Sequence, residues 1–89
     1  MIQKNITIIN KLGLHARAAS KLVSIAQRFE SQIILSQGDK KANAKSIMSL
    51  LVLAAPKHSE LVLEVDGEDE SDAEAAITTL INNRFDESE

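Results

Sequence analysis

The stretch Gly13-Leu14-His15-Ala16-Arg17-Ala18-Ala19-Ser20 places a histidine where a strand-like run ends and a helix-like run begins. The first N–H groups of a helix have no intrahelical partner, and together with the helix dipole they favour an anion. Because the same field disfavours imidazolium, we expect the His15 ring to stay neutral and nucleophilic. Such a ring can attack phosphorus and hold the new phosphate against free N–H groups, with Arg17 as a nearby cation. The stretch therefore predicts a site that carries phosphate.

A single histidine before a helix is a common arrangement. On its own it is more often an incidental or capping residue than a nucleophile. The rest of the chain has to decide between these two interpretations.

The chain has 89 residues, of which 44% are hydrophobic. This size suits one globular domain over residues 1–89 with one modest core. There is no cysteine, which excludes disulfides, thiolate metal sites and thiol nucleophiles, and favours an intracellular protein. No apolar run is long enough to span a bilayer, and the N-terminus does not resemble a signal peptide. We therefore expect a cytoplasmic protein without membrane insertion.

The net charge of −3 hides an uneven distribution. Residues 1–58 sum to +7, whereas residues 59–89 sum to −10. The half that contains His15 could attract phosphorylated groups or acidic surfaces, although a dispersed, solvated surface explains the pattern equally well. Nucleic-acid binding is not expected, because Phe29 and Phe85 are the only aromatic residues and no stacking platform is available.

Residues 2–9 predict a strand, with Ile6 and Ile8 on one side and Thr7 on the other. After His15 the apolar positions fall at helical spacing: Ala16, Ala19, Leu22, Val23, Ala26 and Phe29. Residues 33–35 favour a strand, and residues 36–39 have the composition of a tight turn before a short return through residues 40–43. A helix followed by a hairpin is thus expected after the first strand.

Ser46 is a natural N-cap for a short helix over residues 47–55, which Pro56 ends. This helix has more apolar positions than one face can bury. One face holds four of them: Ile47, Leu50, Leu51 and Ala54. Met48, Val52 and Leu53 fall outside that face, so some of these side chains form either an exposed contact patch or edges covered by loops. An internal strand also remains open for this run.

Residues 61–65 alternate as a strand does, and Asp66-Gly67 ends it as a turn would. Ser71 and Glu74 have the spacing of a capping box for a last helix. Residues 86–89 are expected to be a frayed acidic tail. The order is therefore βαββαβα, which predicts an α+β, two-layer open-faced sandwich: a four-stranded antiparallel sheet with three helices on one face.

Two motifs together resemble a known family. Gly13-Leu14-His15-Ala16-Arg17 is similar to the active-site motif of the histidine-containing phosphocarrier (HPr) family of the bacterial phosphotransferase system. Lys45-Ser46-Ile47-Met48 is similar to the family's second signature, and the βαββαβα order is that of the family. The resemblance covers essentially the whole chain.

The resemblance implies a phosphoryl relay. His15 would accept phosphate from enzyme I, itself charged by phosphoenolpyruvate, and pass it to a histidine of an enzyme IIA component. In the family the phosphate is bonded to Nδ1 near the first helical N–H groups, which here belong to Ala16 and Arg17, and the Arg17 side chain assists. The family's apolar docking surface maps onto Ile47, Met48 and Leu51.

Ser46 is similar to the serine that a dedicated HPr kinase/phosphorylase modifies in many members. Phosphate there would add negative charge beside the docking surface without unfolding the helix. An ordinary N-cap is the alternative. One departure from the family pattern is Ala18, which stands where most members have proline. Because alanine is also an excellent helix former, we expect phosphoryl transfer to be retained.

The resemblance implies a monomeric carrier of sugar transport that is not itself an enzyme. A regulatory, nitrogen-branch paralogue that acts mainly by phosphorylation-dependent protein binding is the alternative, and a small-ligand or RNA-binding domain is a third. No cofactor is expected, because paired carboxylates and a glycine-rich phosphate loop are both missing. No metal site is expected either, because His58 lacks further ligands at a suitable spacing from His15.

Overall fold

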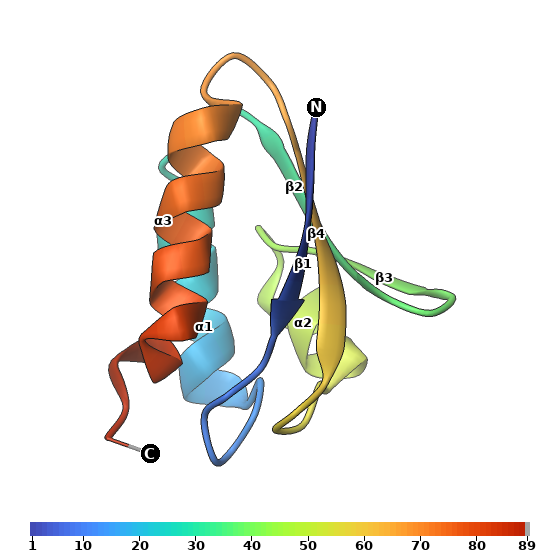
Figure 1. Ribbon diagram of the computed structural model, residues 1–89, viewed down its shortest axis with the longest axis vertical. Coiled ribbons are helices and arrows are strands. Elements are labelled where there is room, and N and C mark those ends of the chain that lie inside the picture. The colour runs from blue at the N-terminus through green and yellow to red at the C-terminus, as the bar shows by residue number, and fades with distance from the viewer. Residues whose placement is uncertain (89) are drawn as a thin grey trace.

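The computed structural model describes residues 1–88 and contains four strands and three helices, with a short 3₁₀ turn at the end (Figure 1). In chain order these elements are β1 (Ile2–Thr7), α1 (Ala16–Ala26), β2 (Gln32–Gln37), β3 (Lys40–Asn43), α2 (Ile47–Leu53), β4 (Glu60–Asp66), α3 (Glu70–Asn82) and η1 (Arg84–Asp86). The βαββαβα order is confirmed. No helix within residues 1–88 is both long and apolar enough to cross a membrane.

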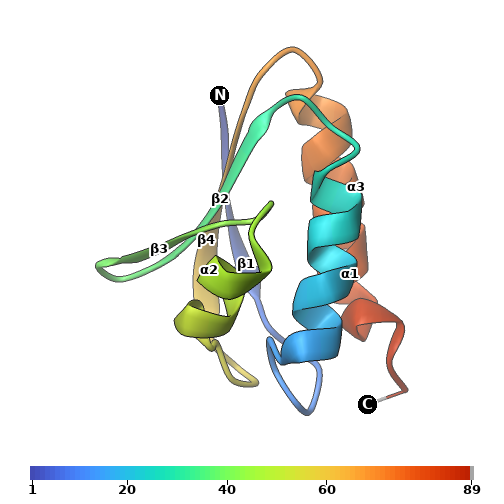
Figure 2. The same cartoon turned by 180° about the vertical axis from the view of Figure 1, so that it is seen from behind.

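The sheet is antiparallel throughout, in the order β1-β4-β2-β3. The central strand β4 alternates as predicted, with Leu61, Leu63 and Val65 buried and the residues between them more exposed. Its neighbours match this register, because Ile6 lies opposite Leu61 and Ile33 lies opposite Val65. The three helices cover the same face of the sheet, with α1 and α3 side by side (Figures 1 and 2). The predicted open-faced sandwich is confirmed.

Helix α1 begins at Ala16 as predicted, and most of its predicted apolar stripe is buried: Ala19, Leu22, Val23 and Ala26. Ala16 is exposed, whereas Ala18 is completely buried beside Ala19 and Leu22. The helix ends at Ala26, so Phe29 packs against the core from the following turn. Ala18 is buried in addition because α1 packs against both α2 and α3, which widens the face that has to be apolar.

Helix α2 confirms Ser46 as its N-cap: the Ser46 hydroxyl accepts a hydrogen bond from the Ser49 N–H at 3.2 Å. The predicted buried face was wrong. Leu50 and Leu53 are buried, whereas Ile47, Leu51 and Ala54 are exposed. The helix is a single short segment that ends at an Ala54 with positive φ, so it buries only the narrow strip that faces the sheet and α1.

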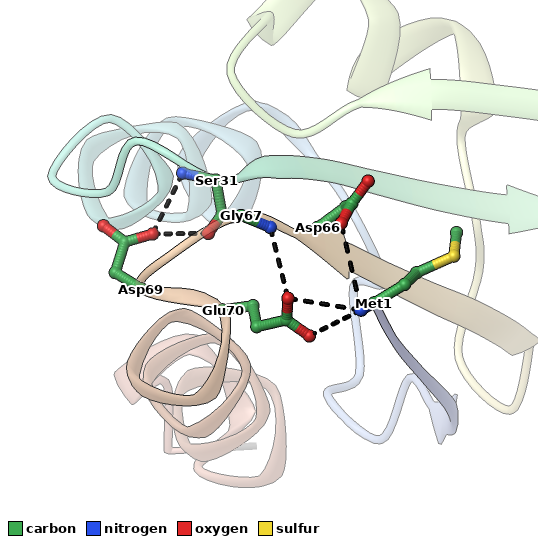
Figure 3. Close-up of polar contacts among 6 residues, drawn as sticks. All are labelled: Met1, Ser31, Asp66, Gly67, Asp69 and Glu70. Carbon is green, nitrogen blue, oxygen red and sulfur yellow. Dashed lines mark hydrogen bonds and ion pairs between the residues drawn. The ribbon is translucent and has the colours of Figure 1, made fainter.

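Helix α3 does not begin with the predicted capping box. It begins at Glu70, which puts Ser71 inside the helix and exposed, and its N-cap is Asp69. The Asp69 carboxylate does not cap the helix; it accepts bonds from the Ser31 N–H at 3.0 Å and the Ser31 hydroxyl (Figure 3). It also accepts a bond from the Glu30 N–H at 2.8 Å. A contact between distant parts of the chain thus sets the helix start.

The other carboxylate at this helix start belongs to Glu70 (Figure 3). It accepts a hydrogen bond from the Gly67 N–H at 3.3 Å and lies 2.9 Å from the Met1 ammonium, which is also 3.8 Å from Asp66. The bond with the Met1 ammonium lowers the pKa of Glu70 and raises the pKa of the ammonium. These contacts join the start of β1 to the turn between β4 and α3.

Asp69→Asn should lower the melting temperature at neutral pH, because the amide loses the charge that holds the Glu30 and Ser31 N–H groups. The Ser31 hydroxyl and the two N–H groups lower the pKa of Asp69 in the folded protein. A carboxyl group whose pKa is lower in the folded protein than in the unfolded chain stabilises the fold at pH values above the pKa of the unfolded chain. This stabilisation is lost as the pH falls through the pKa of the folded protein. The difference in melting temperature between wild type and variant should therefore shrink below about pH 4.

Thermal unfolding followed by circular dichroism from neutral to acidic pH measures this difference. Asp72→Asn is the matched control, because Asp72 is exposed in the same first turn. A difference for Asp69→Asn that is independent of pH would contradict the assignment.

Candidate functional site

His15 lies at the N-cap position of α1, at the end of a tightly held loop. The Leu14 N–H donates to the Ala55 carbonyl at 2.8 Å, and the buried Leu14 side chain anchors the loop in the core. The His15 backbone is extended, with φ −83° and ψ 179°, and its carbonyl accepts the first helical bond from Ala19 at 2.8 Å. The ring does not cap the helix. Backbone bonds and a buried leucine therefore place the ring, which stays partly exposed.

The backbone N–H groups of Ala16 and Arg17 have no hydrogen-bond acceptor among residues 1–88. They are the first N–H groups of α1, so they provide the partial positive charge that the sequence predicts beside His15. The Arg17 side chain is exposed and borders a hollow of about 500 Å³, which is also lined by two cations, Lys11 and Lys21, and two acids, Asp86 and Glu87. The site thus combines a ring nucleophile, free N–H groups and several cations, which suits an anion.

The predicted frayed tail is wrong for Asp86 and Glu87, whose side chains make hydrogen bonds within the protein. After α3 the chain makes the turn η1, and the segment that follows it lies near the start of α1 (Figures 1 and 2). The Glu87 carboxylate lies 2.5 Å from His15 Nε2. Glu89, the last residue of the predicted tail, lies outside the described residues. A carboxylate that was assigned to solvent therefore belongs to the site.

Asn10 is a second site residue that the sequence pattern did not reveal. Its side chain is completely buried, and its Nδ2 donates to the Gly13 carbonyl at 2.8 Å and to Glu87 Oε1 at 3.0 Å. Both partners are acceptors, which fixes the orientation of the amide. Asn10 therefore connects the loop before His15 to the tail that contacts the ring.

The tail is anchored by Phe85, whose side chain is completely buried. The Lys21 ammonium donates to the Phe85 carbonyl at 2.8 Å. Arg84, Phe85 and Asp86 have φ values of 56°, 53° and 63°, which form a left-handed turn. Each such residue costs about 1–2 kcal/mol, so the turn requires the buried ring to hold it. The sequence analysis missed this anchor, although one large apolar residue in a polar tail is a signal that could have indicated it.

Glu87 is ionised more readily than an ordinary glutamate. Burial disfavours the carboxylate, but the hydrogen bonds from Asn10 and His15, together with the charge of Lys21, outweigh burial and lower the pKa of Glu87. The site therefore holds a fixed negative charge on the Nε2 side of the ring.

The three predicted docking residues share an exposed apolar surface on α2. The exposed fractions are 43% for Ile47, 72% for Met48 and 36% for Leu51. Val52, exposed by 72%, lies on the same helix. Helix α2 packs against α1, as Figure 2 shows. The apolar positions that exceed what the core can bury therefore face solvent.

Two further residues lie where the sequence suggested. His58 is exposed, in a turn with φ 76°. Ala18 is the third residue of α1, and its N–H has no acceptor among residues 1–88. A proline in its place would therefore remove no hydrogen bond.

Residues 2–83 match the family model described as the PTS HPr component phosphorylation site. The chain belongs to the HPr family. The phosphocarrier protein HPr of Cupriavidus necator is 51% identical over the full length of both chains. The crystal structure of HPr-C-His from Thermoanaerobacter tengcongensis, 40% identical, superposes with a TM-score of 0.95 and covers all of both chains.

Two other HPr relatives differ in name or assembly. The phosphocarrier protein NPr of Shewanella violacea is 43% identical, over 97% of this chain and 94% of the relative. A crystal structure described as an HPr dimer from Thermoanaerobacter tengcongensis is 41% identical, with a TM-score of 0.78 over 98% of this chain and all of that one. Relatives of this chain therefore include a protein named NPr and an HPr structure described as a dimer.

Proposed function

We propose that this HPr-family protein is a phosphocarrier that holds a phosphoryl group on His15. It would receive the group from enzyme I, charged by phosphoenolpyruvate, and deliver it to enzyme IIA components. One observation carries the proposal: His15 is the N-cap residue of α1, and the N–H groups of Ala16 and Arg17 that follow it have no acceptor among residues 1–88. A phosphate on the ring would be stabilised by these groups and by the Arg17 guanidinium.

In this proposal the protein is a covalent intermediate between partner enzymes and not a catalyst. The single domain over residues 1–89 would act as a cytoplasmic monomer without a cofactor or metal. Ile47, Met48 and Leu51 would form the docking surface for enzyme I and enzyme IIA, since apolar residues at the centre of an interface supply most of its binding energy.

Ser46 would be the site of regulatory phosphorylation by an HPr kinase/phosphorylase. Its hydroxyl is the N-cap of α2, next to Ile47 and Met48. A phosphate there would repel acidic partners from the docking surface.

The relative named NPr supports a second candidate: a regulatory paralogue that acts mainly through phosphorylation-dependent binding. Both candidates use His15 and the same docking surface. Pull-downs with candidate enzyme IIA domains, before and after phosphorylation, separate them, because a relay transfers its phosphate and a regulator retains it.

Incubation with enzyme I and phosphoenolpyruvate, followed by intact-mass measurement, tests the carrier function. We expect one acid-labile phosphoryl group per chain on the wild type and none on His15→Ala. His58→Ala is the control, because it removes an exposed histidine outside the site. Phosphate that persists on His15→Ala, or no phosphate on the wild type, would contradict the proposal.

A further inference from the structure

We propose that Glu87 is a positioning residue for His15: its carboxylate holds the hydrogen on Nε2 and so presents Nδ1 as the nucleophile. The inference deepens the proposed phosphocarrier function and rests on it. Its basis is the 2.5 Å contact between Glu87 Oε2 and His15 Nε2. An ionised carboxylate only accepts hydrogen bonds, so Nε2 has to be the donor, and the neutral ring then has its lone pair on Nδ1.

The structure prepares this contact in advance of any phosphorylation. Glu87 uses its two oxygens separately: Oε2 faces His15, while Oε1 accepts from Asn10. The Asn10 amide is itself fixed by its bond to the Gly13 carbonyl. Buried Phe85 and the bond from Lys21 to the Phe85 carbonyl hold the tail in place. A carboxylate held by so many contacts orients an imidazole as the third member of a hydrolase triad does.

The charge of Glu87 also suits the product of the reaction. The Nδ1 lone pair forms the bond to phosphorus, and the bond between phosphorus and the phosphorylated partner protein breaks, with its electron pair leaving on the partner. The hydrogen on Nε2 stays there throughout, so the ring of the product carries one positive charge. Glu87 faces this positive charge from the Nε2 side and stabilises it. The phosphate is bonded to the other nitrogen, so the carboxylate does not occupy its position.

The opposite role would be a block, in which Glu87 ties up the ring or repels the incoming phosphate. Two features argue against it. The carboxylate contacts Nε2, the nitrogen that does not take the phosphate in the proposed function. The hollow next to Glu87 is lined by three cations (Lys11, Arg17 and Lys21) and two carboxylates (Asp86 and Glu87), so its lining is positive on balance toward an arriving anion.

The experiment compares full-length wild type with Glu87→Gln and Glu87→Ala. Glu68→Gln is the matched control, because it removes an exposed acid in the connection before α3, at the other end of that helix. The first measurement is the ¹⁵N chemical shift of both His15 ring nitrogens at neutral pH, which needs no partner protein. We expect the Nε2–H form in the wild type and a measurable share of the Nδ1–H form in Glu87→Ala.

The second measurement is steady-state phosphorylation by enzyme I with phosphoenolpyruvate. We expect kcat to fall about tenfold in Glu87→Ala, the lower end of the loss seen when a metal-binding histidine loses its orienting carboxylate, with KM unchanged. Glu87→Gln keeps an acceptor without the charge, so its kcat should lie between the two. Glu68→Gln should match the wild type.

The outcomes separate the two proposals. Suppose that the wild type is phosphorylated on His15 but that Glu87→Ala has the same Nε2–H form of the His15 ring and the same kcat as the wild type. Glu87 then has no positioning role, and the carrier function stands. Faster phosphorylation of Glu87→Ala would show that the contact is a block and would overturn the inference. A wild type that accepts no phosphate overturns the carrier function and this inference together.

Discussion

Replacing Phe85 by alanine is expected to lower the free energy of unfolding by about 3–5 kcal/mol, the usual cost of truncating a fully buried phenylalanine. Phe85 is completely buried although it follows the last helix. Its ring also compensates the left-handed turn over Arg84–Asp86. Without the ring the tail should detach, and the contacts of Glu87 with Asn10 and His15 should be lost with it.

Urea unfolding measures the loss of stability, and the His15 ring resonances report detachment of the tail. Phe85→Leu is the matched control: it keeps an apolar side chain and should cost only about 1 kcal/mol. Equal unfolding midpoints for Phe85→Ala and the wild type would show that the tail does not contribute to the core.

Gly13→Ala is expected to destabilise the protein by about 2–5 kcal/mol, because two effects add. Gly13 has φ +68°, a conformation that costs a residue with a side chain about 1–2 kcal/mol. A Cβ there would also lie 2.5 Å from the Ala55 carbonyl oxygen and 2.8 Å from Pro56 Cα. Relieving such overpacking costs about 1–3 kcal/mol.

The same carbonyl accepts the Leu14 N–H, so Gly13→Ala should also displace the loop that holds His15. Enzyme I-dependent phosphorylation should slow in parallel with the loss of stability. Gly38→Ala separates the two effects, because Gly38 has φ +59° but no heavy atom within 4 Å of an added Cβ. Urea unfolding that gives equal losses for the two variants would contradict the steric argument.

The fold could be predicted from local patterns because each element follows a simple period. The alternation of Leu61, Leu63 and Val65 describes one face of a strand in any context. Ser46 caps α2 as its position before an apolar run predicts. The start of α3 could not be predicted in this way, because Ser31, far away in the sequence, binds the Asp69 carboxylate and sets the helix boundary.

The choice of buried positions on the helices was also decided by packing. Periodicity identifies a set of apolar positions, but the neighbouring elements select which of them face the core. Leu53 is buried and Leu51 is exposed on the same short helix, since only one strip faces the sheet and α1. The apolar residues of α2 that do not face the sheet or α1 are left exposed to solvent.

The sequence by itself determined the order of elements, the place of His15 at the start of a helix and the nearby Arg17, because these depend on contiguous residues. Only the tertiary structure decided what faces the ring. Glu87 lies 72 positions away along the chain, and no local period relates it to His15. It reaches Nε2 because buried Phe85 and the Asn10 amide hold the tail across the start of α1.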